Sequence, residues 1–233
     1  MVHLAGAGGA PKLLAACEDF FICSYAGEQA LSDQINQDYR QSFFIYAVYQ
    51  VAKKLREIHN CNISHNDLKA DNIVFDEVTR QYSIIDYGLS TRMGDCKHPI
   101  TDPKEFKRVN WLAPEIKRGA NVTPAGDIYS LGMLLGHILG EFKDPNPRAM
   151  IAFGKATQED PRDRPSLDEF IGLLGSACDS VENDMHYHIA QTKLEEILAH
   201  YKSSRESQDS NSMDWRNLGT FEPDDKEGAS SWW

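Results

Sequence analysis

The chain of 233 residues has few of the features that mark membrane, secreted or nucleic-acid-binding proteins. No apolar run approaches the roughly 20 residues that a membrane-spanning helix needs. The five cysteines are an odd number and form no C-x-x-C pair, which favours reduced thiols over a disulfide scaffold. Acidic residues outnumber basic ones by 35 to 24, and the net charge of −11 disfavours nucleic acid as a main partner. We therefore expect a cytoplasmic protein without a membrane span.

Hydrophobic residues make up 41% of the chain, which is enough for a packed core. In residues 39–60 they recur every three or four positions, and this period predicts a long amphipathic helix. Residues 125–139 are apolar nearly all round, which is typical of a buried central helix. Ser166 and Glu169 form a capping box for another helix. Further helices are expected at 148–157, 166–174 and 186–202.

Two pairs of short β-prone runs predict two β-hairpins. The first pair is 13–17 and 20–23, and the second is 73–75 and 82–85. Polar residues 28–38 are expected to be helical in their first half. The segment 88–109 is polar, contains two prolines and is expected to be a long irregular loop. The sequence therefore predicts a mainly α fold with two short hairpins.

Polar residues with catalytic potential gather between the long helix and the second hairpin. The sequence there reads His65-Asn66-Asp67-Leu68-Lys69-Ala70-Asp71-Asn72. Asp86-Tyr87-Gly88 begins fourteen residues after Asn72, and Ala113-Pro114-Glu115 follows the long loop. Each motif alone is a weak signal, but the order, spacing and context of the set are specific. Over about residues 10–174 the chain resembles the catalytic lobe of the eukaryotic protein kinases.

The resemblance implies a site for phosphoryl transfer. Asp67 matches the catalytic-loop aspartate that accepts the hydrogen bond of the substrate hydroxyl, and Lys69 would reach the transferred phosphoryl group. Asn72 and Asp86 match the two metal-ligand positions, and one carboxylate with one amide oxygen suits Mg²⁺. The implied cofactors are ATP and Mg²⁺, and the implied partner is a protein substrate.

The first hairpin resembles the strand and hinge that hold adenine in this family. The implied contacts are the carbonyl of Ser24 and the N–H of Ala26, with Val74 as the floor under the ring. Other matching positions have structural roles in the family. Of these, His65 and Tyr87 would pack in an internal column, Glu115 and Arg164 would form an ion pair, and Asp127 would hold the catalytic-loop backbone.

The chain departs from the family at its beginning, because it has no G-x-G-x-x-G-x-V loop, no V-A-I-K strand and no helix with the partner glutamate. We expect a kinase-like C-lobe with most of the N-lobe absent. Residues 1–27 would be a remnant of the N-lobe and hinge, and 28–174 the C-lobe. A C-terminal helix would occupy 175–202 and a disordered tail 203–233. A chain without the phosphate-binding loop and lysine is expected to be a poor catalyst by itself.

Two further departures concern regulation and substrate class. Asn66 stands where many kinases carry an arginine that pairs with a phosphate on the activation loop, so activity is expected not to require loop phosphorylation. The segment 107–112 lacks the Gly-Thr pair common in Ser/Thr kinases, whereas Lys69 favours that class.

Three functions are compatible with the sequence. The first is an ATP-dependent protein kinase of the Ser/Thr type, and the second is a pseudokinase-like module that binds partners. The third is a phosphotransferase for small molecules, since aminoglycoside and choline kinases share an H-x-D-x-x-x-x-N loop. Ala113-Pro114-Glu115 and Arg164 favour the protein-kinase branch over the third. The oligomeric state is left open.

Overall fold

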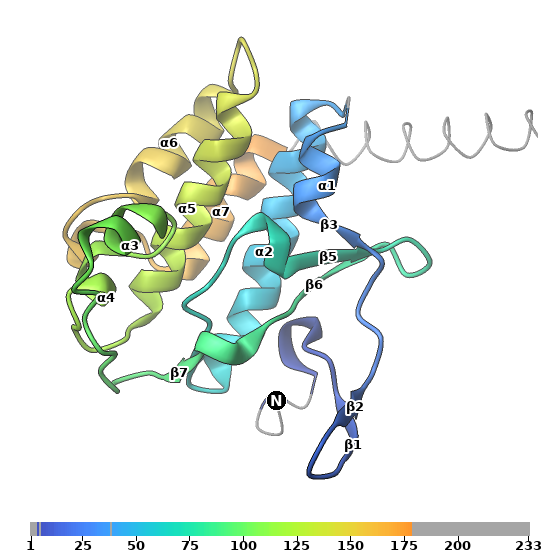
Figure 1. The fold of residues 1–233 in the computed structure, drawn as a ribbon. Coiled ribbons are helices and arrows are strands. Elements are labelled where there is room, and N and C mark those ends of the chain that lie inside the picture. Colours follow the sequence, from blue (N-terminus) through green and yellow to red (C-terminus); the bar gives the residue numbers. More distant parts are fainter. Residues whose placement is uncertain (1–3, 5, 38, 179–233) are drawn as a thin grey trace, which may run out of the picture. The chain divides into compact units, whose positions relative to one another are not determined.

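The computed structural model describes residue 4, residues 6–37 and residues 39–178. They belong to the first of two compact units, 1–185, while the second unit, 186–233, lies outside the described residues. The helix predicted at 186–202 and the tail predicted at 203–233 therefore lie outside them too. In the described ranges, packed helices adjoin three small antiparallel sheets (Figure 1).

A long helix, α2 (Gln41–Asn60), forms the centre of the helical part. It packs against α5 (Pro124–Gly140) and α7 (Leu167–Cys178), and α5 also packs against α6 (Pro147–Ala156). The apolar residues whose period predicted α2 are all buried: Phe44, Val48, Val51, Leu55 and Ile58. The prediction of both long helices is therefore confirmed, with ends that differ by one or two residues.

Side-chain caps fix where the shorter helices begin. Asn146 accepts hydrogen bonds from the N–H groups of Arg148 and Ala149, and Pro147 opens α6. The capping box before α7 is present, because the Ser166 N–H donates to Glu169 Oε2 (2.8 Å) and the Glu169 N–H to Ser166 Oγ (3.3 Å).

The second predicted hairpin is the pair β5 (Ile73–Asp76) and β6 (Gln81–Ile84). A short strand, β3 (Gln29–Ala30), extends this hairpin to a sheet of three strands in the order β3-β5-β6. Ile73, Phe75 and Ile84 are buried in the same core as α2. A separate pair, β4 (Ile63–Ser64) and β7 (Thr91–Arg92), joins the segment after α2 to the segment after β6. Both ends of the motif-bearing region are thus tied down.

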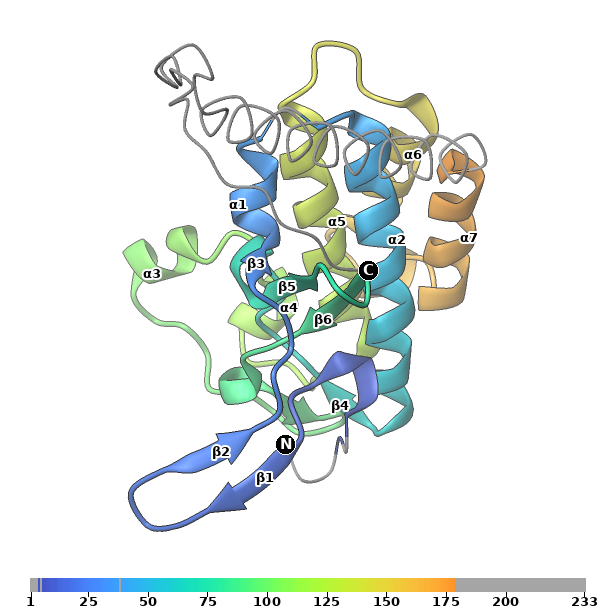
Figure 2. The same cartoon turned by 90° about the vertical axis from the view of Figure 1, so that its right-hand side faces the viewer.

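The first predicted hairpin, β1 (Leu13–Ala16) with β2 (Phe21–Cys23), is also present. It differs from β5–β6 in that every residue of both strands is exposed. Figure 2 shows it projecting away from the helices. Its apolar composition therefore has no covering surface within the described residues.

The glycine cluster at the start of the chain is packed on the helical part. Ala7–Gly9 form a turn of 3-10 helix that packs on α2, and the Gly8 N–H donates to Glu57 Oε2 (2.9 Å). Gly8 has φ +67°, and a Cβ there would lie 2.6 Å from the Ile58 side chain. Glycine is therefore required by both the backbone conformation and the close approach.

Two predicted segments differ from the structure. The helix expected in the first half of 28–38 lies in its middle, as α1 (Leu31–Ile35), because the preceding residues pair as β3. The loop 88–109 contains β7 and a short helix, α3 (Pro103–Arg108), whose first turn Asp102 caps. Another short helix, α4 (Pro114–Lys117), follows it. No helix in the described ranges combines the length and apolarity needed to cross a bilayer.

Candidate active site

The backbone of the loop 65–72 is held by one fully buried carboxylate, that of Asp127 at the start of α5. Asp127 Oδ2 accepts hydrogen bonds from the His65 N–H (2.8 Å), Ser64 Oγ (2.7 Å) and His59 Nε2 (2.9 Å). Its Oδ1 accepts from the Asn66 N–H (2.8 Å). The prediction that Asp127 holds this backbone is therefore confirmed by its contacts.

The same contacts explain the charge of Asp127. Burial by itself would raise the pKa of this carboxyl, but the hydrogen bond and charge of His59 and the hydrogen bond of the Asn66 N–H hold the pKa below its usual value. The carboxylate consequently stays ionised inside the protein and can accept all four hydrogen bonds.

His65 is a packing residue in this structure. Its Nδ1 accepts a hydrogen bond from the Asp67 N–H (3.3 Å), and its Nε2 donates to the Ile85 carbonyl (2.9 Å). The ring meets Tyr87 edge to face at 4.9 Å, as predicted. Burial lowers the pKa of His65, so the neutral ring is favoured. This histidine links the loop to the end of β6.

The carboxylate of Asp67 is buried and contacted by three side chains. Asn72 Nδ2 donates to Oδ2 (2.8 Å), Trp111 Nε1 donates to Oδ1 (2.8 Å), and the Lys69 ammonium lies 3.3 Å from Oδ2. Each carboxylate oxygen offers about two acceptor sites, so Oδ1, which accepts from Trp111, keeps capacity for a substrate hydroxyl. The structure thus brings together Asp67, Lys69 and Asn72, three of the residues singled out in the sequence.

Asn72 and Asp86 lie at the open end of the second hairpin, opposite its turn. Asn72 directly precedes β5, and the Ile85 N–H, one residue before Asp86, donates to the Asn72 carbonyl (2.9 Å). Asn72 Nδ2 also donates to the Asp67 carbonyl (2.8 Å). Because the amide nitrogen faces Asp67, Asn72 Oδ1 is the atom left for a cation. Asp86 adopts a left-handed conformation (φ +59°) and accepts a hydrogen bond from the Gly88 N–H (3.2 Å).

This donor set fits Mg²⁺, which takes oxygen ligands and is usually held by one or two protein groups together with phosphate oxygens. In the described part of the chain, no group of three or more His, Cys, Asp or Glu side chains has the arrangement of a metal site. Asn72 and Asp86 would therefore share the ion with the phosphates of a nucleotide.

Of the predicted adenine contacts, Ser24 and Ala26 lie between β2 and β3, and Val74 lies in β5. Ser24 is fixed to the hairpin, since its N–H donates to the Lys12 carbonyl and its Oγ accepts from the Lys12 N–H, both at 2.8 Å. The Glu28 N–H donates to the Phe75 carbonyl (3.2 Å), so the segment containing Ala26 meets β5 beside Val74. These contacts tie Ser24 to the first hairpin and the segment after Ala26 to β5, and they leave the role of the three residues in nucleotide binding as a prediction.

Asn66, where many kinases carry arginine, joins the loop to the long segment after β6. Its side-chain amide donates to the Ser64 carbonyl (3.2 Å) and the Leu89 carbonyl (3.3 Å). Together with the β4–β7 pairing, this bond holds the start of that segment without a charged group.

The predicted ion pair of Glu115 and Arg164 is present and bidentate, with N–O distances of 2.6 and 2.8 Å. Arg164 also donates to three backbone carbonyls and stacks on Tyr129, 4.9 Å from the ring centroid. This buried pair connects α4 to the segment before α7. It supports the loop that carries Trp111.

Trp111 is the residue of this site that sequence reasoning missed. It lies in the segment noted only for lacking a Gly-Thr pair, yet its indole contacts Asp67, and the Lys69 ammonium lies 5.0 Å from its ring centroid. Forty-four residues separate Trp111 from Asp67. A single tryptophan in a loop carries no period or spacing that could have indicated this contact.

Comparison with known proteins assigns the arrangement to a family. Residues 18–170 match the family described as protein kinase domain. The chain is 28% identical over 152 residues to the serine/threonine-protein kinase pkn2 of Myxococcus xanthus, covering 58% of this chain and 17% of that protein. It is 30% identical over 126 residues to the calcium and calcium/calmodulin-dependent serine/threonine-protein kinase DMI-3 of Medicago truncatula, covering 52% of this chain and 23% of that protein.

A solved structure supports the fold. The kinase PK-1 of the Cydia pomonella granulovirus matches with a TM-score of 0.60 and 18% identity, covering 73% of this chain and 77% of that one. The chain spans less than a quarter of the length of the two curated relatives. Since the family match covers more than half of the chain, the protein belongs to the protein kinase domain family.

Proposed function

We propose that this chain is the C-lobe part of a protein kinase that transfers the γ-phosphoryl group of ATP to a hydroxyl group of a protein. The observation that carries the proposal is the geometry of Asp67, whose carboxylate is buried and oriented by Asn72, Lys69 and Trp111. In phosphoryl transfer most of the catalysis comes from positioning and charge, and a fixed carboxylate supplies the first.

In this proposal Asp67 accepts the proton of the attacking hydroxyl as the general base. Lys69, whose ammonium lies beside Asp67, would neutralise charge on the transferred group. Asn72 and Asp86 would hold Mg²⁺, which when bound neutralises the phosphates. Ser24 and Ala26 would pair with adenine through backbone groups, and Val74 would pack against the ring.

The chain's features also bear on class and regulation. Lys69 and the names of the two relatives support a Ser/Thr kinase. The Asn66 bond to the Leu89 carbonyl supports activity that needs no phosphate on the loop, because the contact is already made by a neutral amide. All five cysteines are free, which supports a reducing compartment such as the cytoplasm.

The test is phosphate transfer from ATP to a general protein substrate, with Asp67→Asn as the critical variant. The substitution keeps the shape but removes the base, so transfer is expected to fall about 100-fold or more. Asp144→Asn, at an exposed position, is the matched control and should transfer phosphate as the original chain does. Full transfer by Asp67→Asn would contradict the role given to Asp67.

Nucleotide binding provides a second measurement that does not depend on turnover. Mg-dependent ATP binding should be measured by titration calorimetry for the chain and for Asp86→Asn. We expect Asp86→Asn to lose the Mg-dependent part. Because the chain by itself is expected to be a poor catalyst, the binding measurement decides, and a chain that does not bind Mg·ATP would contradict the proposed site.

A second candidate, a pseudokinase-like binding module, is favoured by one observation. The hairpin β1–β2 and the residues next to it expose large apolar side chains: Leu14 (64%), Phe20 (62%), Phe21 (61%), Ile22 (50%) and Tyr25 (70%). Contiguous apolar surface of this kind marks a protein contact. The oriented Asp67 carboxylate argues for chemistry beyond binding, and the Glu115–Arg164 pair favours a protein kinase over a small-molecule phosphotransferase.

A further inference from the structure

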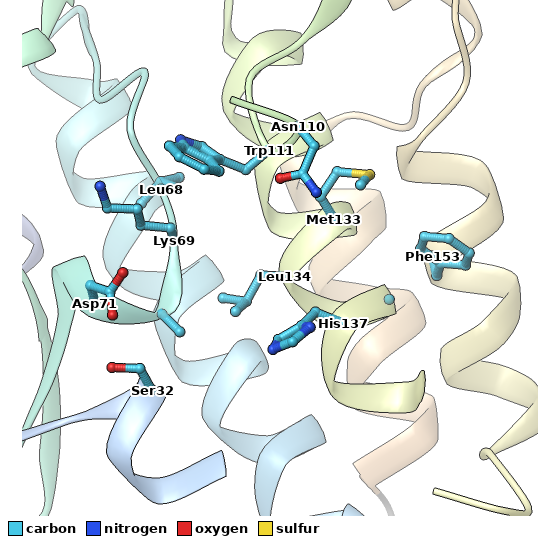
Figure 3. Close-up of a pocket in the computed structure, with 12 residues that line it drawn as sticks. Ser32, Leu68, Lys69, Asp71, Asn110, Trp111, Met133, Leu134, His137 and Phe153 are labelled. Atoms are coloured by element: carbon cyan, nitrogen blue, oxygen red, sulfur yellow. The ribbon is translucent and has the colours of Figure 1, made fainter. Parts of the chain in front are cut away.

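The hairpin β1–β2 has no part in the cavity beside Asp67. That cavity, of about 530 Å³, is lined by Lys69 and Trp111, which both contact Asp67, so it belongs to the candidate active site (Figure 3). Neither strand of the hairpin contributes a residue to its lining in the described part of the chain. The apolar side chains of the hairpin therefore need a different explanation.

Exposed apolar side chains concentrate at this hairpin. Six of the ten large hydrophobic side chains that are exposed in the described chain lie in it or beside it: Leu13, Leu14, Phe20, Phe21, Ile22 and Tyr25. Both strands are exposed along their whole length, and a two-stranded hairpin without cover is marginally stable in water. The hairpin thus favours a partner that adds strands to it.

The outer edge of β1 is open to a further strand. Within the described residues β1 pairs only with β2, in a sheet of two strands. Figure 2 shows β1 on the side of the hairpin that faces away from the helices. Residues 13–17 contain no proline and no charged residue, two features that protect edge strands from pairing. The backbone groups on this edge can therefore pair with another chain.

Opposite charges at the two ends of β1 favour an antiparallel partner with the same sequence. Lys12 precedes the strand and Glu18 follows it in the turn. Along an extended strand these residues lie about 20 Å apart, so they do not pair within one copy. When two copies of β1 lie antiparallel with Ala15 opposite Ala15, Lys12 of each copy faces Glu18 of the other. A parallel arrangement would instead place like charges together, which is unfavourable.

The same register also matches the side chains of the two strands by size. Leu14 of each copy lies opposite Ala16 of the other, and Leu13 lies opposite Cys17. Each large side chain thus meets a small one, which lets neighbouring strands pack closely. β1 carries a bulge between Leu13 and Ala15, and a two-fold axis at Ala15 gives both copies the same local twist.

We propose that β1 is a homodimer interface. The hairpins of two copies of this chain pair antiparallel through β1 around a two-fold axis at Ala15, and they form one four-stranded sheet. The contact is isologous, because both copies use the same residues, and it closes at two copies along β1. The two ion pairs between Lys12 and Glu18 at its ends fix the register. The inference concerns association alone and holds whether or not the chain transfers phosphate.

The first experiment measures the mass of the full chain in solution by sedimentation velocity at increasing concentrations. We expect a monomer–dimer equilibrium and no larger species. Lys12→Glu places like charges at both ends of the contact and should raise the dimer dissociation constant about tenfold. Lys104→Glu, which makes the same charge change at an exposed position of α3, should leave it unchanged. A chain that stays monomeric would overturn the proposal and leave the hairpin to a partner of another kind.

A charge exchange separates this contact from unspecific adhesion. Glu18→Lys should weaken the dimer as Lys12→Glu does, whereas the double variant with both substitutions should restore it. An equimolar mixture of the two single variants should also associate, because each copy then supplies the charge that the other needs. A double variant as weak as the single ones would contradict the antiparallel register, and dimers unaffected by either single substitution would place the interface elsewhere. Both results would overturn the proposal.

Disulfide formation tests the position of the two-fold axis. The three exposed cysteines are first replaced, by Cys17→Ser, Cys23→Ser and Cys96→Ser. Ala15→Cys in this chain should then give a covalent dimer on mild oxidation, since paired strands bring facing Cα atoms within the range of a disulfide. Ala120→Cys, at another exposed alanine, should remain monomeric. Equal yields of covalent dimer from the two variants would overturn the pairing through Ala15.

Discussion

The hairpin β1–β2 and the loop 65–72 are opposites in side-chain burial: the hairpin exposes apolar side chains, and the loop buries polar ones. In the hairpin, apolar side chains such as Phe21 and Ile22 are 61% and 50% exposed. In and next to the loop, Ser64, His65, Asn66 and Asp67 are all buried. Both arrangements cost free energy unless apolar surface is covered by a partner or buried polar groups find hydrogen-bond partners.

The two regions differ in whether that compensation lies within the described chain. Ser64, His65, Asn66 and Asp67 all have hydrogen-bond partners, and the Asp127 carboxylate alone accepts four hydrogen bonds in this region. The exposed side chains of the hairpin have no such cover in the described part. A polar cluster that is internally satisfied therefore marks a site, while an uncovered apolar hairpin marks a surface that fits a partner.

The largest loss of stability is expected when Asp127, the acceptor for the buried donors of the loop, is removed. Asp127→Ala leaves the buried donors of Ser64, His65 and Asn66 without an acceptor and His59 without its partner. The free energy of unfolding should fall by about 4 kcal/mol, as for other broken buried pairs. Urea unfolding measures this, with the exposed Asp144→Ala as control. A loss below about 1 kcal/mol would mean that water replaces Asp127.

A matched isoleucine pair compares the two hairpins directly. Ile84 of β6 is fully buried and Ile22 of β2 is half exposed. Ile84→Ala should lower the free energy of unfolding by about 3 kcal/mol, because it leaves a cavity in the core. Ile22→Ala should change it by no more than about 0.5 kcal/mol. Similar losses in urea unfolding would show that the first hairpin is covered in solution.

The buried histidine of the loop should make stability depend on pH. Burial lowers the pKa of His65, so the unfolded chain takes up its proton at a higher pH, about 6.5, than the folded chain does. Stability should therefore decrease as the pH falls from about 6.5 towards the lower pKa of the folded state. His65→Asn should reduce this slope, measured by urea unfolding at several pH values. The exposed His98→Asn is the control, and an equal slope in His65→Asn would contradict the prediction.

The smallest effect on stability is expected for a polar hairpin. The double substitution Phe21→Ser and Ile22→Thr should leave the free energy of unfolding within about 0.5 kcal/mol, because both side chains are exposed. It should instead reduce self-association at high concentration, measured by sedimentation velocity. Unchanged self-association would contradict this prediction and show that other residues mediate it.

Long helices with a clear period could be predicted from the sequence, and the shortest helices could not. The stripe of α2 and the apolar composition of α5 indicated both helices. α1 has five residues and α3 has six, which is too few for a period to appear. The beginning of α3 did carry a signal, since Asp102 and Pro103 are a typical N-cap and first helical residue.

The residues of the site also differ in whether they could be predicted from the sequence. The motif residues of the loop lie close together in the sequence, so their spacing indicated their grouping. Trp111 reaches Asp67 through the fold and carried no local signal. The exposure of the first hairpin could not be predicted either, because β-prone apolar runs predict a pair of strands and do not indicate which surface covers them.

The four hydrogen bonds of Asp127 also determine when the loop 65–72 can form during synthesis. Three of its partners lie 61 to 63 residues earlier in the chain, so the loop takes its final backbone only after α5 has been made and has docked. Such long-range contacts form slowly, because a large loop of chain must first be closed. The residues of the loop 65–72 are thus translated early and ordered late, and in the meantime the nascent chain exposes the loop without the hydrogen bonds of Asp127.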